Sequence, residues 1–358
     1  MSTRPRITFD SRGWCNACQW AEEKKNLDWS DRQSELNQIL DAHRSSDGSF
    51  DCVVPVSGGK DGSYVAHQLK NVYGMHPLAI TVTPALTLGL GNLNLQNFIA
   101  SGYNHIQVNP SENQLRILNK QGFIHKGFPY YGWLMAMQAA PLKLSARLNI
   151  SLIFYGEEGE TEYGGSTRLK NVPFYDVGFM REIYLEGGQD LVFKQANLEN
   201  EALPFFRFPS KEEIGDGELK ITHWSYFENW DPYRNYLVAK EHCGLIESSD
   251  TNHGTFTNFA QNDQALYSLH AYMMYLKFGF GRATQDAGIE IRRGAMLREQ
   301  GLNLVKLYDG IYPEQEIETY LDYYQMTKTE FDGVIDKWTN KSLFEKISGY
   351  WKPTFTII

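Results

Sequence analysis

Cysteine is scarce in this sequence, with four residues among 358. That count argues against a scaffold held together by disulfide bonds. The first ten residues contain no apolar segment of the kind found in secretory signals. No apolar run in the chain approaches the roughly 20 residues that a membrane-spanning helix needs. We therefore expect a cytoplasmic protein with no membrane partner.

Basic runs are also absent. The chain has 34 Lys and Arg against 43 Asp and Glu, a formal net charge of -9. Proteins that bind nucleic acid generally carry a basic patch, so this balance predicts no nucleic-acid partner. A locally basic groove within an acidic total remains compatible with the composition.

Apolar runs alternate with amphipathic segments over the first half of the chain. Such alternation predicts an α/β fold with a doubly wound parallel sheet. Strands are predicted at 50–56, 78–82, 105–108 and 151–155, and helices at 30–44, 63–73, 97–100 and 133–148. We expect Ser30 to cap the first of these helices.

Past this region the pattern changes. Residues 160–207 lack clear periodicity and are predicted to form loops and short helices, whereas the rest is mainly helical. The later helices are predicted at 263–278, 294–308, 313–324 and 327–338. Three regions follow from this pattern: a Cys-containing segment (1–47), an α/β domain with its loops (48–210) and a helical C-terminal part (211–358).

The most informative segment is Ser57-Gly58-Gly59-Lys60-Asp61-Gly62-Ser63, which joins a predicted strand to a predicted helix. A helix N-terminus offers free N–H groups and a partial positive charge to phosphate. Glycines let the backbone approach the phosphate oxygens. Lys60 adds a cation, and Asp61 could hold Mg²⁺ or order the loop. The alternative is an ordinary glycine-rich turn.

This segment is not a Walker A loop, because G-x-x-x-x-G-K-[ST] is absent. It resembles the S-G-G-x-D-S loop of the PP-loop ATP pyrophosphatases, which have an adenine-nucleotide α-hydrolase-like fold. Members of that class split ATP between the α and β phosphates and adenylate a carbonyl oxygen. The resemblance implies that backbone at the end of the second strand, at Ile80, Thr81 and Val82, reads adenine, and the alternative is a core strand with no ligand contact. Gly62 stands where the class usually has serine, so the hydroxyl that touches phosphate, Ser57 or Ser63, is left open.

A wider resemblance is to the N-acetyl sugar amidotransferases of bacterial surface-glycan pathways. It rests on the phosphate loop and on Ile7-Thr8-Phe9-Asp10, Cys15-Asn16-Ala17-Cys18, Gly91-Asn92-Leu93-Asn94-Leu95-Gln96-Asn97-Phe98, Gly156-Glu157-Glu158-Gly159-Glu160, Tyr163-Gly164-Gly165, Asn258-Phe259-Ala260-Gln261-Asn262-Asp263, Lys277-Phe278-Gly279-Phe280-Gly281-Arg282 and Glu290-Ile291-Arg292-Arg293-Gly294. These blocks span almost the whole chain.

The resemblance implies a reaction. ATP would activate the oxygen of a sugar N-acetyl group as an imidoyl adenylate, and ammonia would displace AMP to leave an acetamidino group. Family members receive ammonia from a glutaminase subunit and a channel subunit similar to the cyclase of histidine biosynthesis. Their products include acetamidino forms of pseudaminic and legionaminic acid and of amino-uronic sugars in the O-antigen of lipopolysaccharide.

Cys15 and Cys18 form a C-x-x-C pair, a spacing typical of zinc ligands. Two thiolates do not complete a tetrahedral site, and Cys243 and His242 are the candidates to finish it. The alternatives are a redox pair or two ordinary thiols.

Several carboxylates follow the predicted strand 151–155, and ligands in open α/β sheets bind at strand ends. Glu157 and Glu160 are therefore predicted to be catalytic, as Mg²⁺ ligands or proton acceptors, and Glu158 to orient the sugar. The alternative is a solvated acidic loop. The surrounding stretch 156–182 is predicted to cover the site and exclude water.

The remaining predicted substrate contacts are spread along the chain. Asn94 and Asn97 could bind sugar hydroxyls or cap and turn the backbone. Arg282 and Arg292 could bind a carboxylate or phosphate, or form surface ion pairs. Tyr163, which lies in one of the blocks that carry the family resemblance, is also predicted to contact the substrate.

Two other functions remain compatible with the sequence. A PP-loop enzyme that modifies tRNA, such as a thiolase, would explain the C-x-x-C pair but predicts a basic face. A non-catalytic assembly subunit with a vestigial loop would not need Lys60 and Asp61.

Overall fold

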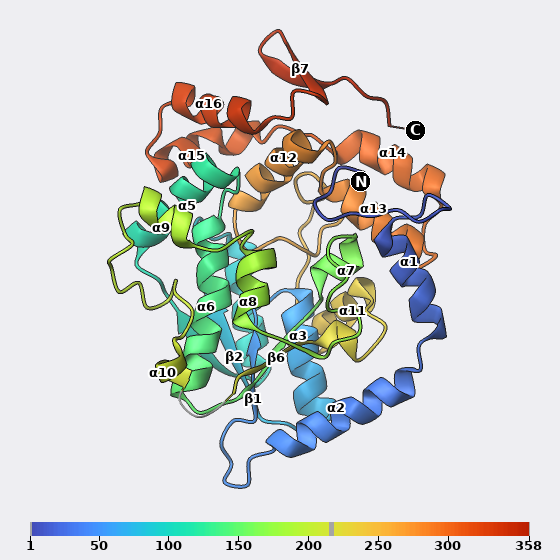
Figure 1. The fold of residues 1–358 in the computed structure, drawn as a ribbon, viewed down its shortest axis with the longest axis vertical. Helices are drawn as coiled ribbons and strands as arrows, with labels where there is room; N and C mark the ends of the chain where they lie inside the picture. Colours follow the sequence, from blue (N-terminus) through green and yellow to red (C-terminus); the bar gives the residue numbers. More distant parts are fainter. Residues whose placement is uncertain (1, 215–217, 358) are drawn as a thin grey trace.

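The computed structural model describes residues 2–214 and 218–357. A six-stranded sheet with strand order β3-β2-β1-β4-β6-β5 forms its centre (Figure 1). The pairings are parallel except for β5, which runs antiparallel to β6 at the edge. The strands are β1 (Cys52–Pro55), β2 (Pro77–Val82), β3 (Asn104–Val108), β4 (Leu152–Tyr155), β5 (Phe174–Tyr175) and β6 (Lys220–His223). The predicted α/β class and mostly parallel sheet are confirmed, whereas β5 and β6 were not predicted.

Both faces of the sheet are buried. Along β1, Cys52 and Val54 point into one apolar core, and Val53 between them points into the other. Successive side chains of a strand face opposite ways, so a strand covered on both sides is apolar throughout. This explains why β1 and β2 read as continuous apolar runs rather than as alternating patterns.

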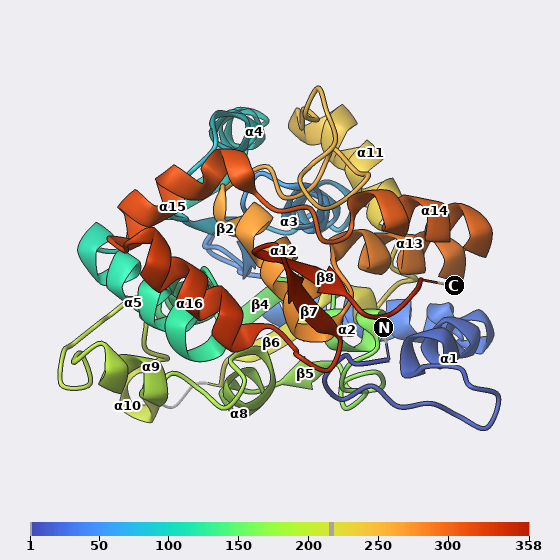
Figure 2. The ribbon, with the colours of Figure 1, turned by 90° about the horizontal axis from the view of Figure 1, so that it is seen from above.

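Helices cover the two faces. Helices α3, α4 and α11 lie together on one side of the sheet (Figure 2), and α5 and α6 contribute to the core on the other. These helices are α3 (Lys60–His67), α4 (Gly89–Ala100), α5 (Glu112–Lys126), α6 (Tyr131–Arg147) and α11 (Pro232–Cys243). The structure corrects the sequence reading here, because α5 and α11 were not predicted and α4 is much longer than 97–100.

The sheet has a topological switch point. The chain runs from β1 through β2 to β3 at one edge, and then crosses back to place β4 on the other side of β1. Ligands in such sheets bind in the crevice beyond the carboxyl ends of the strands at this point. The segments that leave these two ends are 57–60 and 156–159.

The N-terminal segment packs on the loops that follow β4. It contains α1 (Asn16–Glu23) and α2 (Trp29–His43), and α1 lies against α7 (Gly159–Tyr163). Lys24 Nζ lies 2.8 Å from a carboxylate oxygen of Glu162, which also accepts the Trp20 Nε1–H at 2.9 Å. Helix α2 is capped by Asp28, whose carboxylate accepts the Ser30 and Asp31 N–H groups, rather than by Ser30 as predicted.

The C-terminal part is mainly helical and ends in a hairpin. Its elements are α12 (Leu266–Phe278), α13 (Arg282–Arg292), α14 (Arg298–Tyr308), α15 (Ile317–Tyr324), α16 (Lys328–Trp338), β7 (Phe344–Ile347) and β8 (Tyr350–Pro353). Helices α12, α15 and α16 bury side chains in the same core as α5 and α6. The helix predicted over 294–308 corresponds to α14, which begins at Arg298, whereas α13 was not predicted.

Short elements fill the connections. They are α8 (Val177–Phe179), α9 (Asp190–Gln195), α10 (Lys211–Ile214), the 3-10 turns η1 (Lys24–Asn26), η4 (Trp224–Tyr226) and η5 (Glu314–Glu316), and the π-helical turns η2 (Gln68–Val72) and η3 (Met180–Tyr184). None of the helices in the described residues is long and apolar enough to cross a membrane.

Candidate functional site

The loop between β1 and α3 is shaped by close packing. Gly58 has φ +80°, and a Cβ there would overlap the backbone nitrogen of Leu95 in α4. Only glycine is compatible with both the conformation and the contact. Gly59 is the N-cap of α3 and provides no side-chain cap. The first-turn N–H groups therefore have no helical partner and are available to a ligand.

Close packing explains why glycine stands at position 62. A Cβ on Gly62 would lie 2.8 Å from the Pro55 carbonyl oxygen, so a serine does not fit at this position. Ser63 is fully buried, and its carbonyl accepts a weak bond from the Cys243 thiol at 3.8 Å. The Ser63 hydroxyl is buried without a hydrogen-bond partner, and Ser63 does not line the loop's cavity, so its predicted phosphate contact has no support from the lining. Ser57 is the loop serine that lines the cavity.

A cavity of about 310 Å³ opens beside this loop. Its volume is at the lower end of the range for small-molecule sites. The residues around it are Ser57, Gly58, Gly59, Lys60, Asp61, Gly62, Gly91, Asn94, Tyr130, Glu157, Leu245, residues 259–263, Tyr267 and Arg282. The loop after β1 and Glu157, which lies just beyond the end of β4, therefore meet at one cavity, as the topology of the sheet leads us to expect.

Asp61 is held from two sides. Its Oδ2 pairs with the Lys60 ammonium, and its Oδ1 accepts a hydrogen bond from Asn235 Nδ2 at 3.1 Å. Asn235 belongs to α11, and nothing in the sequence singled it out. The two contacts fix the Asp61 carboxylate beside the loop.

Glu157 is the acidic residue of the 157–162 cluster that lines the cavity. Its Oε1 accepts the Tyr163 hydroxyl at 2.9 Å, whereas Oε2 is buried without a hydrogen-bond partner. Burial raises the pKa of Glu157 to about 7, and the negative charge of Asp61 adds to this effect, while Lys60 and Arg282 oppose it. A buried carboxylate with an unpaired oxygen is costly, which marks a place for a cation or a proton.

Arg282 reaches the same cavity from the start of α13. Its Nε lies 2.9 Å from Asp286 Oδ1, and Thr255 donates to Asp286 Oδ2 at 2.6 Å. Burial lowers the pKa of Arg282, but Asp286, Tyr163 and Glu157 more than offset this and raise it overall. A fixed guanidinium thus sits in the cavity wall, and its predicted contact with a substrate stays a prediction.

Sequence reasoning missed one wall of the cavity. Asp263 lines it together with Tyr130 and Tyr267, whose ring centroids are 5.2 Å apart. Burial raises the pKa of Asp263 to about 6, and the Tyr267 hydroxyl lies 3.4 Å from its Oδ2. Asp263 closes one of the blocks that carry the family resemblance, and that block was the available signal. Residues 156–182 were predicted to cover the site, but only Glu157 of this stretch lines the cavity. Residues 259–263 line it instead.

The other predicted acidic residues face away from the cavity. Glu160 pairs with Arg6 at 2.7 Å and Arg4 at 3.4 Å, and it accepts the Ser166 N–H. Glu158 caps α7 through the Glu160 and Thr161 N–H groups. The predicted catalytic role of Glu160 and sugar contact of Glu158 therefore have no geometric support. Their positions on α7 direct them to the N-terminal segment and to the helix's own first turn.

Four further predicted contacts have protein partners. Asn94 lines the cavity, but its side chain is bonded to the Ile246 backbone at 2.9 and 2.8 Å. Asn97 donates to the Gly244 carbonyl at 2.8 Å. The Thr81 hydroxyl donates to Val56 O, and Val82 O accepts the Trp133 indole N–H. Neither Thr81 nor Val82 lines the cavity, so the cavity gives no support to the predicted contact of these residues with adenine.

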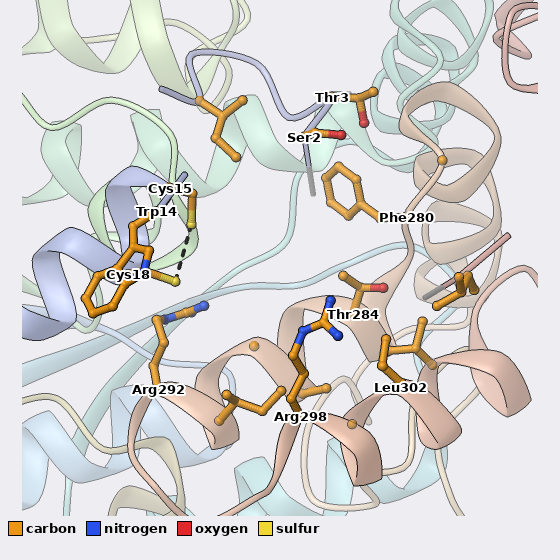
Figure 3. Close-up of a pocket in the computed structure, with 18 of the residues that line it drawn as sticks. Ser2, Thr3, Trp14, Cys15, Cys18, Phe280, Thr284, Arg292, Arg298 and Leu302 are labelled. Atoms are coloured by element: carbon orange, nitrogen blue, oxygen red, sulfur yellow. Dashed lines mark hydrogen bonds between the residues drawn. The ribbon is translucent and has the colours of Figure 1, made fainter. Parts of the chain in front are cut away.

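The cysteine pair lies at a second, larger cavity of about 1050 Å³ between the N-terminal segment and α13 and α14. The Sγ atoms of Cys15 and Cys18 are 3.6 Å apart, and Arg292 extends from α13 toward them (Figure 3). A hydrogen bond with the Cys18 thiol lowers the pKa of Cys15 to about 5, and the same interaction raises the pKa of Cys18. Arg292, predicted to bind substrate, also donates to the Glu162 carbonyl at 3.0 Å.

The predicted completion of a zinc site is not supported. Cys243 is buried against Ser63 in the core between α3 and α11, and the His242 ring stacks on His67. Neither residue lies at the cavity that holds Cys15 and Cys18. Among the described residues, no group of three or more His, Cys, Asp or Glu side chains could hold a metal ion.

The comparison with protein families gives one finding. Residues 253–356 match the model described as "LPS biosynthesis protein WbpG-like, C-terminal domain". This match includes Asp263 and Arg282 of the cavity and supports a surface-polysaccharide biosynthesis family. No protein of curated function matches the chain.

Proposed function

We propose that this protein is an ATP-dependent amidotransferase that converts a sugar N-acetyl group to an acetamidino group in lipopolysaccharide biosynthesis. The observation that carries the proposal is the joint cavity at the switch point. A glycine-rich loop, Lys60 and two carboxylates, Asp61 and Glu157, line it together with Arg282 from the segment that matches the WbpG-like model. The glycine-rich loop thus opens on the same cavity as Asp263 and Arg282 of the segment that matches the WbpG-like model.

ATP would bind with its phosphates at the loop. The free N–H groups at the start of α3, the Ser57 hydroxyl and the Lys60 ammonium are the donors that surround a phosphate. Lys60 would exchange its contact with Asp61 for the phosphate oxygens. This use of the loop matches the PP-loop class that the sequence resembles.

Asp61 and Glu157 fit a magnesium ion. The buried, unpartnered Oε2 of Glu157 provides an oxygen in need of a cation, and Asp61 supplies a second carboxylate nearby. Magnesium in nucleotide sites is commonly held by one or two carboxylates together with substrate phosphates and water. When bound, the ion would neutralise charge on the pyrophosphate leaving group.

The part of the cavity wall formed by Tyr130, Tyr267 and Asp263 would take the sugar. Tyr130 and Tyr267 present rings and hydroxyl groups, and Asp263 presents a carboxyl group. Aromatic faces with polar edges suit a ligand that is partly apolar and partly hydroxylated. Arg282 would bind an anionic group of the substrate.

The chemistry proceeds in two displacements. The acetamido oxygen attacks the α-phosphorus of ATP, the bond to the β-phosphate oxygen breaks, and pyrophosphate leaves. Ammonia then attacks the imidoyl carbon, AMP leaves with the former amide oxygen, and loss of a proton gives the acetamidino group. Adenylation is needed because an amide oxygen is otherwise a very poor leaving group.

The ammonia source would be a separate protein. The sequence contains no recognisable glutaminase nucleophile motif. We propose a glutaminase subunit and a channel subunit similar to the histidine-pathway cyclase as partners, as the family resemblance implies.

Mass spectrometry of candidate N-acetyl sugars tests this function. The protein is incubated with the sugar, ATP, Mg²⁺ and an ammonium salt, which replaces the partner subunits. The expected product has one oxygen replaced by NH, and AMP and pyrophosphate appear in equal amounts. Release of ADP and phosphate would overturn the adenylation step, and release of AMP without an amidino product from any acetamido sugar would overturn the substrate class.

A further inference from the structure

Asn235 connects α11 to the phosphate loop. It is fully buried, and its Nδ2 donates to Asp61 Oδ1 at 3.1 Å. Its position in the second turn of α11 is fixed because Asp231 caps this helix through the Tyr233 and Arg234 N–H groups. Helix α11 also has the most extensive packing on α3 of any helix pair. The amide is therefore delivered to Asp61 by rigid elements.

The orientation of this amide is determined by its other partner. Asn235 Oδ1 accepts from Arg234 Nη2 at 3.2 Å, so the nitrogen must face Asp61. Arg234 is itself held by Glu228, whose Oε1 lies 2.5 Å from Nη2, and by the ring of Tyr64 at 4.7 Å. Tyr64 lies one turn after Asp61 in α3. The contacts that run from Glu228 through Arg234 and Asn235 to Asp61 therefore begin and end next to α3, the helix that contains both Tyr64 and Asp61.

The contact with Asn235 becomes more important when a nucleotide binds. In the structure, Asp61 has two partners, Lys60 and Asn235. A phosphate group would draw the Lys60 ammonium away, which leaves Asn235 as the remaining side chain bonded to Asp61 Oδ1. A neutral donor is suited to this task, because it orients one carboxylate oxygen without competing with a metal ion for the charge.

We propose that Asn235 is the positioning residue for Asp61, and that it orients this carboxylate toward the metal ion of the nucleotide complex. The inference rests on the proposed ATP and Mg²⁺ site. Asn235 does not touch substrate in this assignment. It acts through Asp61, and its contribution is therefore confined to the metal-dependent part of nucleotide binding.

The test measures binding of a fluorescent ATP analogue to the full chain, in Mg²⁺ and in EDTA. The ratio of the two dissociation constants reports the Mg²⁺-dependent gain in affinity. In Asn235→Ala we expect this gain to fall by about ten- to a hundredfold, the range for loss of a hydrogen bond to a charged group. Binding in EDTA should stay within about twofold of the wild type, because the loop and Lys60 are intact.

Two further variants separate positioning from stability. Asn119→Ala removes an equally buried asparagine amide, which donates to Tyr323 OH at 2.9 Å and accepts the Trp133 N–H at 3.0 Å. Asn119 belongs to α5, which packs on the opposite face of the sheet from α3. This substitution should lower the melting temperature but keep the Mg²⁺-dependent gain. Asn235→Ser keeps a polar group in the buried position and serves if the alanine variant does not fold. It should show the same loss of Mg²⁺ dependence.

A double-mutant cycle supplies the second readout. Asp61→Ala alone should reduce the Mg²⁺-dependent gain, and adding Asn235→Ala should change it no further, because residues that act as one unit are not additive. An unchanged gain in folded Asn235→Ala or Asn235→Ser protein, or full additivity in the cycle, would refute the positioning role. A wild-type protein that binds the analogue equally in Mg²⁺ and EDTA would instead refute the proposed metal site.

Discussion

Replacing Glu157 by glutamine is expected to raise the free energy of unfolding of the protein. The same change is expected to weaken the binding of Mg²⁺ with ATP. The carboxyl is buried, and its pKa rises from 4.5 to about 7 in the folded state. A pKa raised on folding means that the folded state holds the proton to higher pH than the unfolded chain does. Ionised Glu157 is therefore destabilising, and its cost grows as the pH increases from about 4.5 to about 7.

The magnitude follows from the pKa difference. At 1.36 kcal/mol for each pH unit between the two pKa values, ionised Glu157 costs roughly 3 kcal/mol above pH 7. Glutamine retains the acceptor for the Tyr163 hydroxyl and carries no charge. Glu157→Gln should therefore be more stable than the wild type by roughly 2–3 kcal/mol at pH 8, and nearly equal to it at pH 4.5.

Urea denaturation in EDTA at pH 4.5 and pH 8, followed by tryptophan fluorescence, measures the two differences. Thermal unfolding at pH 8 with and without Mg²⁺ adds a functional arm. Mg²⁺ and an ATP analogue should raise the melting temperature of the wild type but have much less effect on Glu157→Gln. A stability difference that is the same at both pH values, or a variant less stable than the wild type at pH 8, would refute the assignment of Glu157 as a buried, charge-strained carboxylate.

Three other changes test separate parts of the structure. Glu160→Gln should lower the free energy of unfolding by roughly 2–4 kcal/mol, because it leaves two arginines without their carboxylate. The Kd of a fluorescent ATP analogue should be unchanged. A large loss of binding would instead support the predicted catalytic role of Glu160. Gly62→Ala should lower stability by about 1–3 kcal/mol through overpacking against Pro55, seen as a lower melting temperature, and an unchanged melting temperature would contradict the close contact. Iodoacetamide at pH 6, after chelator treatment, should label Cys15 well before Cys18, because only the thiolate reacts. Peptide mass spectrometry measures the two labelling rates. Equal rates would contradict the difference in pKa between the two thiols.

Short-range patterns were sufficient for strands β1 to β4 of the central sheet. The apolar runs that became β1 and β2 are buried on both faces, so composition alone identified them. The edge strand β5 has two residues, and β6 follows an irregular stretch, so neither carried a readable period. Helix α11 was missed because its first turn follows a polar, aromatic loop and its buried face is used by contacts with α3 rather than by a regular apolar stripe.

The cavity shows the same division. Ser57, Lys60 and Asp61 are neighbours in the chain, and the strand–turn–helix pattern around them was enough to place them at one site. Glu157 and Arg282 were predicted as candidates, but the sequence could not show that they share a cavity with the loop. Asp263 was visible only within a resembling block, and Asn235 carried no signal.

The sequence by itself determined the glycine-rich loop between β1 and α3, because a helix start, its glycines and its charged residues form one local unit within residues 57–63. Tertiary structure decided which carboxylates lie at the cavity beside that loop. Glu157 directly follows β4 and faces the cavity, whereas Glu160 and Glu162 lie on α7 and turn toward the N-terminal segment. It also brought Asn235 to Asp61 across 174 positions of sequence. Such contacts are set by how α11 packs on α3, and no local propensity encodes them.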